Sequence, residues 1–169
     1  MHITNLRHLL THELQDLHSA EVQIIDCLPI LINSANSEEL KSALQNHLEV
    51  TREQLRSLEL IDGNLNAEKD GAVCVGMKGI VSEAQNGLES ILDINTKDAA
   101  IIASAQKIEH YEIAAYGSAL QFARQLELND VADELERSLK EEKEADQELS
   151  SLAEGGLFSK GINKKAIDD

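Results

Sequence analysis

Apolar residues recur every three or four positions along four long stretches of this chain, and this spacing limits its fold more than any other feature. The period matches the 3.6 residues per turn of an α-helix, so each stretch would bury one face of a helix. The stretches run from Leu6 to about Ile32, from Glu38 to about Asp62, from about Asn95 to Leu126 and from Val131 to about Ala153. We therefore predict an all-α protein with four long helices.

The composition agrees with a helical body. The 169 residues include one proline, nine glycines and 2% aromatic residues, and 42% of the positions are hydrophobic. This length and hydrophobic content suit one well-buried domain. We expect a helical bundle over residues 1–154 and a peripheral C-terminal tail over residues 155–169, because Gly155 and Gly156 end the last helix.

The connections between the helices predict how they pair. Short loops join the first helix to the second and the third to the fourth, so each pair is expected to form an antiparallel hairpin. Residues 64–79 have no long periodicity and predict a crossover, followed by a short helix from about Ile80 to Leu92. Two antiparallel hairpins joined by a long crossover are the connectivity of a ferritin-like four-helix bundle.

The charge and the hydropathy of the chain argue against several classes of partner. A formal net charge of −16 disfavours nucleic acid and anionic membranes, since such binding depends on clustered Lys and Arg. No stretch has the 18 or more apolar residues of a transmembrane helix and no leader is recognisable, so we expect a cytoplasmic protein. Cys27 and Cys74 lack the spacing of a zinc or disulfide motif and are predicted to be free thiols.

Two carboxylates lie on the apolar stripe of the fourth helix. Glu142 and Asp146 are four residues apart, so at about 100° per residue they project within about 40° of each other, on the face of Leu135, Leu139 and Leu149. Buried carboxylates without a cation repel one another and retain a proton, so such a pair in a helical core indicates a metal ion. The alternative is a flared end of the bundle where both acids reach water.

The first and third helices carry further acids on their apolar stripes. Glu112 lies near the centre of its stripe and Glu109 nearer the edge, whereas Glu13 lies centrally on the first helix and Asp16 is displaced by about 70°. Four other acids point away from the stripes and are predicted to be solvated, namely Glu49, Glu53, Glu134 and Glu141.

The level of each residue along the bundle predicts which acids meet. Antiparallel packing of the third and fourth helices places Glu112 level with Glu142 and Asp146, and in the first hairpin it brings Asp16 level with Gln54. The two hairpins would then donate matching sets of oxygen ligands. The predicted metal ligands are Glu13, Asp16, Gln54, Glu109, Glu112, Glu142 and Asp146.

These ligands predict an iron or manganese site. Acids from both hairpins suit two ions about 3 to 4 Å apart, and oxygen donors suit these two metals. The second helix lacks the Glu-x-x-His pair of a full ferritin-type site, so the donors would hold two ions or only one. His47 faces inward, but its level lies about 10 Å from that of Asp16. We therefore interpret His47 as a core or interfacial histidine rather than a ligand.

Five segments that together span most of the chain carry a family resemblance. The most specific is IEHYEIAAYG at residues 108–117, and the others are LQDLHSAE, NHLEVT, CVGMKGIVSEA and LKEEKEADQEL. In these segments the chain resembles the YciE/YciF-type ferritin-like stress proteins. The resemblance implies a ferritin-like four-helix bundle with a rubrerythrin-like metal site, association as homodimers and a link to general or osmotic stress.

Two hypotheses about function follow from these observations. In the first, a carboxylate site binds iron or manganese and reacts with peroxide or oxygen, either like rubrerythrin with an external electron donor or like manganese catalase without one. In the second, the protein is a metal-free helical dimer that acts as a structural or interaction module under stress, with its buried acids held neutral. Ferritin-type storage is a weaker third, because no assembly helix is evident.

Overall fold

The computed structural model describes residues 3–65, 73–156 and 159–167, and these residues confirm the predicted all-α fold. The helices are α1 (Leu6–Ser34), α2 (Glu38–Leu65), α3 (Val75–Glu89), α4 (Ile94–Gln125), α5 (Asn129–Glu154) and α6 (Ile162–Lys165). Between α5 and α6, the two-residue strands β1 (Gly155–Gly156) and β2 (Ser159–Lys160) pair antiparallel. Residues 66–72 of the predicted crossover lie outside the described residues.

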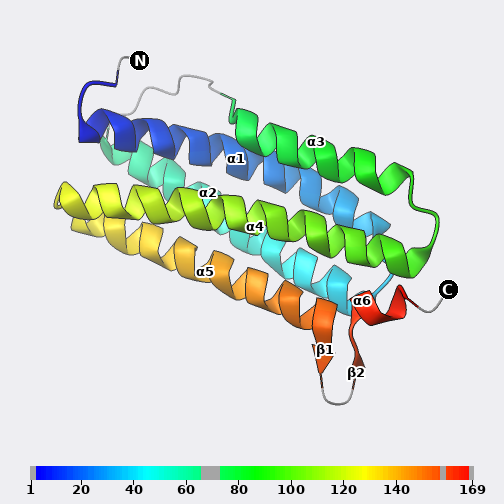
Figure 1. The fold of residues 1–169 in the computed structure, drawn as a ribbon. Helices are drawn as coiled ribbons and strands as arrows, with labels where there is room; N and C mark the ends of the chain where they lie inside the picture. Colours follow the sequence, from blue (N-terminus) through cyan, green and yellow to red (C-terminus); the bar gives the residue numbers. More distant parts are fainter. Residues whose placement is uncertain (1–2, 66–72, 157–158, 168–169) are drawn as a thin grey trace.

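Four helices form a bundle of two antiparallel hairpins, one of α1 and α2 and the other of α4 and α5 (Figure 1). Across the bundle, α1 packs against α4 and α2 packs against α5. The shorter helix α3 runs back along the outside and contacts α1 and α4, so that α4 begins at the end where α2 begins (Figure 1). The predicted connectivity, two hairpins and a crossover with a short extra helix, is confirmed.

The predicted starts of two helices are wrong by a few residues. α3 begins five residues earlier than predicted, at Val75, because Cys74 caps it and its sulfur accepts a backbone hydrogen bond at 3.3 Å. The N-cap of α4 is Asp93 instead of Asn95 or Thr96. Both differences arise because a side chain just before the apolar stripe takes up the free N–H groups of the first turn.

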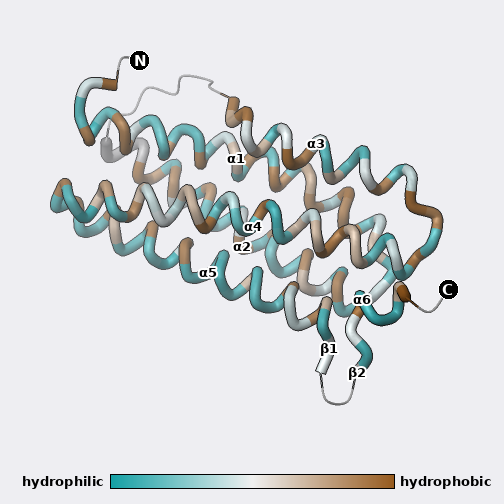
Figure 2. Tube along the Cα trace, viewed as in Figure 1, coloured by the Kyte–Doolittle hydropathy of each residue, from teal (hydrophilic) through white to brown (hydrophobic). Residues whose placement is uncertain are grey.

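The core consists of two apolar clusters, one toward each end of the bundle. The first includes Ile24, Leu31, Leu44, Met77, Ile101 and Leu149, and the second includes Leu14, Leu17, Leu58, Tyr116 and Leu135. Figure 2 shows the corresponding alternation of apolar and hydrophilic positions along each helix. Within the described ranges, no helix combines the length and apolar character that crossing a membrane requires.

The two hairpins are tied together at one end of the bundle by a buried aspartate. Asp98 of α4 is 3% exposed, and its carboxylate accepts hydrogen bonds from the backbone N–H groups of Asn36 (2.6 Å) and Ser37 (2.8 Å). These groups precede α2, so the start of this helix is fixed by a side chain of the other hairpin. The contact sets the register of α2 against α4.

The C-terminal segment packs on the same bundle instead of lying apart from it. Ile162 of α6 is buried in the first core cluster, and α6 contacts both α4 and α5. Gly161 makes this approach possible, because a Cβ atom at this position would lie 2.2 Å from the backbone carbon of Glu154. The segment that we expected to be peripheral therefore contributes one side chain to the core.

Candidate metal centre

A layer of buried polar side chains separates the two apolar clusters. All four helices of the bundle contribute to it near their middle. The members are Glu21 of α1, His47, Thr51 and Gln54 of α2, Glu109 and Glu112 of α4, and Ser138 and Glu142 of α5. Buried polar groups require partners, and buried charges require either a counter-charge or a proton. The contacts within this layer therefore decide what it can bind.

Four members of the layer form a compact group of possible metal ligands. His47, Glu109, Glu112 and Glu142 each offer one donor atom, and these atoms lie within 4.8 Å of one another. The Nε2 atom of His47 lies 3.4 Å from Oε1 of Glu109 and 3.9 Å from Oε2 of Glu142. Three helices thus bring one imidazole nitrogen and three carboxylates to one point, and these residues can hold a metal ion.

The hydrogen bonding of this group fits a cation. Within the described part of the chain, buried ligand atoms without a hydrogen-bond partner occur on all four residues: Nε2 of His47, Oε2 of Glu109, both carboxylate oxygens of Glu112 and Oε2 of Glu142. Such orphaned atoms are rare in folded proteins, and each one costs about 1–3 kcal/mol when it is left unsatisfied. A divalent cation among them would satisfy several at once, and imidazole with carboxylates is a donor set that iron and manganese accept.

The electrostatics of the group are those of crowded acids in a dry interior. Burial raises the pKa of both Glu109 and Glu112 well above 4.5, and the negative charge of Glu142 raises each of them further. Burial lowers the pKa of His47, although the charges of Glu142, Glu148 and Glu141 oppose this change. Without a cation, burial therefore favours the protonated form of these two carboxyls and the neutral form of the imidazole.

Glu21 is the carboxylate that α1 contributes to the layer. It is fully buried, and its Oε1 atom accepts a hydrogen bond from the hydroxyl of Tyr116. Burial raises its pKa to about 8, while the hydrogen bond from Tyr116 lowers it. Its charge in turn raises the pKa of Glu112. Glu21 therefore borders the four-residue group on the side of α1 and α4.

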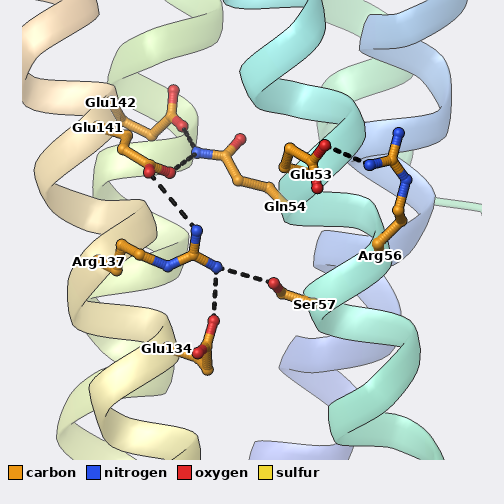
Figure 3. Close-up of polar contacts among 8 residues, drawn as sticks. All are labelled: Glu53, Gln54, Arg56, Ser57, Glu134, Arg137, Glu141 and Glu142. Carbon is orange, nitrogen blue, oxygen red and sulfur yellow. Dashed lines mark hydrogen bonds and ion pairs between the residues drawn. The ribbon is translucent and has the colours of Figure 1, made fainter.

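Gln54 borders the group on the opposite side of the layer. Its side-chain N–H group donates hydrogen bonds to Glu142 and, at 3.1 Å, to Glu141 (Figure 3). Arg137 then connects Glu141, at 3.7 Å, with Glu134 (Figure 3). Glu141, which we predicted to be solvated, is consequently only half-exposed. The Oε1 atom of Gln54 is buried without a hydrogen-bond partner, so it remains available as a neutral donor.

The structure brings together only part of the predicted ligand set. Glu109, Glu112 and Glu142 lie in the four-residue group. Asp146 lies at its margin with 22% of its side chain exposed, accepts a hydrogen bond from Gln106 at 3.2 Å and lies 3.6 Å from His110. Glu13 and Asp16 lie outside the group and are half-buried, and Asp16 accepts a hydrogen bond at 2.6 Å from Tyr111.

The Tyr111 hydroxyl also lies 2.9 Å from the sulfur of Cys74. Cys27 and Cys74 are both buried free thiols, as predicted. The contacts of Asp16 are therefore with a tyrosine and a thiol at the boundary of α1, α3 and α4.

The prediction for α1 named Glu13 and did not include Glu21, because the buried face of α1 shifts along the helix. Near its start, Leu14 and Leu17 pack in the second core cluster, whereas farther along Ile24 packs in the first, which includes residues of α3. A single stripe averaged over the whole helix therefore passes through Glu13. In the structure, the side chain that continues from Leu17 into the polar layer is that of Glu21.

We interpreted His47 as a core or interfacial residue because its level was compared with that of Asp16. Antiparallel packing of the first hairpin predicts that His47 lies opposite Gln23, about 10 Å along the bundle from Asp16. The carboxylate of α1 in the layer is Glu21, which is close to that level. Our interpretation of His47 depended on its predicted distance from Asp16. In the structure, Nε2 of His47 lies 3.4 Å from Oε1 of Glu109, so His47 belongs to the group of candidate ligands.

A pocket of about 170 Å³ lies between α2 and α5 and reaches the four-residue group. His47 and Glu109, both buried, contribute to its lining. Ala43, Leu44, Val50, Ala145 and Leu149 line its apolar part, and Asn46, Glu141, Glu144 and Glu148 complete the lining. Because Asn46, Glu144 and Glu148 are exposed, the pocket leads from the surface to the imidazole and one carboxylate of the group.

Comparison with known proteins places this geometry in a family. Residues 5–166 match the family described as "Domain of unknown function (DUF892)". This chain belongs to the DUF892 family. It is 36% identical over 165 residues to the protein YciF of Escherichia coli strain K12, a match that covers 97% of this chain and 99% of YciF. The resemblance to the YciE/YciF-type family is thereby confirmed.

Solved structures similar to this DUF892 chain support the same fold. The crystal structure of the E. coli stress protein YciF matches with a TM-score of 0.85 and 36% identity, over 89% of this chain and 95% of that one. YcfI from Rhodopseudomonas palustris matches with a TM-score of 0.86 and 37% identity, over 89% and 96%. A Xanthomonas campestris protein with 22% identity and a TM-score of 0.69 supports the fold alone. The predicted ferritin-like fold is confirmed.

Proposed function

We propose that this protein is a metal-binding protein of the stress response and that iron or manganese binds at His47, Glu109, Glu112 and Glu142. The observation that carries the proposal is the set of unpartnered, buried donor atoms on all four residues. The similarity to the E. coli stress protein YciF supports the role in stress. When bound, either metal would supply redox chemistry toward peroxide or oxygen.

The donor set favours one tightly held ion over the two that a full ferritin-type site would bind. Such a site uses a Glu-x-x-His pair from each of two helices. On α5, the residue three positions after Glu142 is Ala145 instead of a histidine. On α2, the residues at this spacing are Thr51 and Gln54 instead of a glutamate and a histidine. A second ion would therefore depend on Glu21 and the Gln54 oxygen, and it would bind more weakly. A homodimer and an external electron donor remain part of the proposal.

The residues around the proposed ion have separate roles in binding. Glu109, Glu112 and Glu142 would supply negative charge, and His47 would supply a neutral nitrogen donor, since burial lowers the pKa of its imidazole. Tyr116 holds Glu21 in place, and Gln54 holds Glu142. Leu and Ala side chains at both ends of the layer exclude water. Loss of two protons, from Glu109 and Glu112, would accompany binding, so affinity should rise with pH.

The second candidate function is a metal-free structural dimer. It is favoured by the raised pKa values of Glu21, Glu109 and Glu112, because protonated carboxyls can remain in a dry layer without a cation. The hydrogen bonds from Tyr116 and Gln54 would then help to hold the layer. Under this alternative, added metal would not bind and would not change the stability of the protein.

Metal analysis of protein purified without chelators tests the proposal. We expect about one equivalent of iron or manganese in the wild type and less than a tenth of that in Glu112→Gln and His47→Ala. Stripped wild-type protein should gain about 2.7 kcal/mol in its free energy of unfolding at a Mn²⁺ concentration one hundred times the dissociation constant. Zinc in place of both metals would contradict the redox role, and metal-free protein that ignores added Mn²⁺ would favour the structural dimer.

Two matched variants separate the four-residue group from the ligands that lie outside it. Glu13→Gln and Asp146→Asn make the same kind of change as Glu112→Gln, but at side chains that are half-buried. Both should retain the metal. The Glu112→Gln variant should fold without metal and be at least as stable as metal-free wild type at pH 7, because the amide resembles the protonated carboxyl of Glu112 but requires no proton uptake. Loss of metal in all three variants would mean that the site is built differently.

A further inference from the structure

The layer that surrounds the four-residue group is closed on the side of α1 and α4. Tyr116, Glu21 and Glu112 are fully buried there, and Leu17 is 1% exposed. On the side of α2 and α5, in contrast, the pocket of about 170 Å³ reaches His47 and Glu109. An ion that arrives after the protein has folded therefore meets a packed wall on one side and a pocket on the other.

The mouth of this pocket is acidic. Glu141, Glu144 and Glu148 of α5 line it, and none of the described residues that line it is Lys or Arg. Glu144 and Glu148 are exposed, with Lys140 at 3.5 Å from Glu144, whereas Glu141 is engaged by Gln54 and Arg137. Glu141 and Glu148 line the same pocket as the buried His47 and Glu109. The acids at the surface are thus joined to the floor by one continuous pocket.

The floor of the pocket carries atoms that lack partners. Nε2 of His47 and Oε2 of Glu109 are buried without a hydrogen bond, and their side chains are 8% and 2% exposed. These two residues belong both to the pocket lining and to the four-residue group. Acids at the mouth, an apolar middle and unpartnered donors at the end form a continuous path. An acidic, low-dielectric channel of this kind concentrates cations and speeds their association.

We infer that the pocket between α2 and α5 is the path by which a divalent cation reaches the buried group, with Glu144 and Glu148 attracting the ion at its mouth. This inference rests on the proposed function. It assigns a role in loading to two side chains that lie outside the ligand set. The first contacts of the incoming ion in the interior would be with Glu109 and His47, and Glu112 and Glu142 would complete its coordination.

The test measures the rate of Mn²⁺ binding to stripped protein by stopped-flow mixing with a fluorescent indicator of free Mn²⁺. In the double variant Glu144→Gln/Glu148→Gln, association should be roughly five- to tenfold slower at low salt. The difference should shrink at about 1 M salt, where screening acts within about 3 Å. The dissociation constant should change less than the rate, because the removed charges lie outside the ligand set.

Two further variants make the test specific. Glu89→Gln/Asp133→Asn removes the same charge from exposed positions that do not line the pocket, and it should bind Mn²⁺ at the wild-type rate. Ala145→Leu narrows the pocket with an apolar side chain, so it should slow both association and dissociation while leaving the dissociation constant within about twofold. The slowing by Ala145→Leu should persist at high salt, because it is steric.

The possible results distinguish this inference from the proposed function. If wild-type protein binds Mn²⁺ and neither the mouth variant nor Ala145→Leu changes the rate, the path is wrong and the metal site stands. Equal slowing by the mouth variant and the Glu89/Asp133 control would also overturn the path, because net charge alone would explain it. If stripped wild-type protein does not bind Mn²⁺ at all, both the path and the proposed function fail.

Discussion

At the scale of single residues, the charge of the polar layer is controlled by side chains that need not touch the metal. Tyr116 is fully buried among apolar residues, yet its hydroxyl donates a hydrogen bond to Glu21. This bond favours the ionised form of Glu21 and opposes the effect of burial on its pKa. A tyrosine of the apolar core therefore tunes a carboxylate beside the proposed ion.

We predict that Tyr116→Phe weakens metal binding without removing it. Loss of the hydroxyl should raise the pKa of Glu21 further, so the ionisation of Glu21 that a bound ion favours costs more free energy at neutral pH. Affinity for Mn²⁺ should fall by roughly tenfold at pH 7, as is typical for residues that orient ligands, and by less at pH 9, where Glu21 ionises in both proteins. Isothermal titration calorimetry at the two pH values measures this difference.

The matched control for this prediction is Tyr111→Phe. The Tyr111 hydroxyl contacts Asp16 at 2.6 Å and Cys74 at 2.9 Å, outside the four-residue group. Its loss should leave Mn²⁺ affinity unchanged and lower the free energy of unfolding by about 1 kcal/mol, the usual contribution of one hydrogen bond. A drop in affinity equal to that of Tyr116→Phe would show that Asp16 belongs to the site after all.

At the scale of helices, the polar layer follows a strict alternation of four and three residues along each seam. On α1 the seam is Leu10, Leu14, Leu17, Glu21, Ile24, Leu28 and Leu31, and on α2 it is Leu40, Leu44, His47, Thr51, Gln54, Leu58 and Ile61. Polar residues interrupt both seams near their middle. This repeat was visible in the sequence, and it identifies Glu21 on α1, whereas a stripe averaged over the helix passes through Glu13.

Other features could not be predicted from such periodicity. The hydrogen bonds from Asn36 and Ser37, just before α2, to Asp98 join residues more than 60 positions apart. The pocket depends on small side chains such as Ala43 and Ala145 at a helix contact. The four long helices and their pairing were predictable because each follows from local pattern and short loops.

We predict that Gly161→Ala separates the C-terminal segment from the bundle. A Cβ atom at Gly161 would lie 2.2 to 2.4 Å from backbone atoms of Ala153 and Glu154, and backbone at a helix end cannot move away easily. Ile162 would leave the core, so the free energy of unfolding should fall by about 2 kcal/mol, the value of burying one Ile side chain. Limited proteolysis should cut the released segment faster than in the wild type.

Gly117→Ala is the matched control within the same chain. Gly117 lies inside α4, and nothing stands within 4 Å of a Cβ atom placed there. Alanine is the better helix former, so this variant should be more stable than the wild type by about 0.5–1 kcal/mol. If Gly161→Ala has the stability and the rate of proteolysis of the wild type, the contacts of Ile162 contribute nothing to the free energy of unfolding.

At the scale of the whole molecule, the buried acids couple folding to both protons and metal. The folded protein holds protons on Glu21, Glu109 and Glu112 more tightly than the unfolded chain, whose glutamates titrate near 4.5. Where the folded state binds more protons, the free energy of unfolding falls as the pH rises. His47 has the opposite effect, but only below about pH 6.5, because above this value its imidazole is neutral in both states.

We therefore predict that metal-free protein loses stability between pH 6.5 and pH 8. In this range Glu21, with a pKa of about 8, is still largely protonated in the folded protein and ionised in the unfolded chain. Each such group should lower the free energy of unfolding by up to about 1.4 kcal/mol per pH unit. Urea denaturation in the presence of a chelator measures the slope, and Glu112→Gln should reduce it by removing one of the groups.

Saturating Mn²⁺ should reverse this dependence on pH. The ion binds the ionised carboxylates and displaces their protons. Its affinity therefore rises over the pH range in which the metal-free protein loses stability. The two stability curves should diverge toward pH 8, and the difference between them at each pH gives the binding free energy. Parallel curves would mean that the acids of the layer keep their protons in the presence of Mn²⁺, which fits the structural dimer and not a metal site.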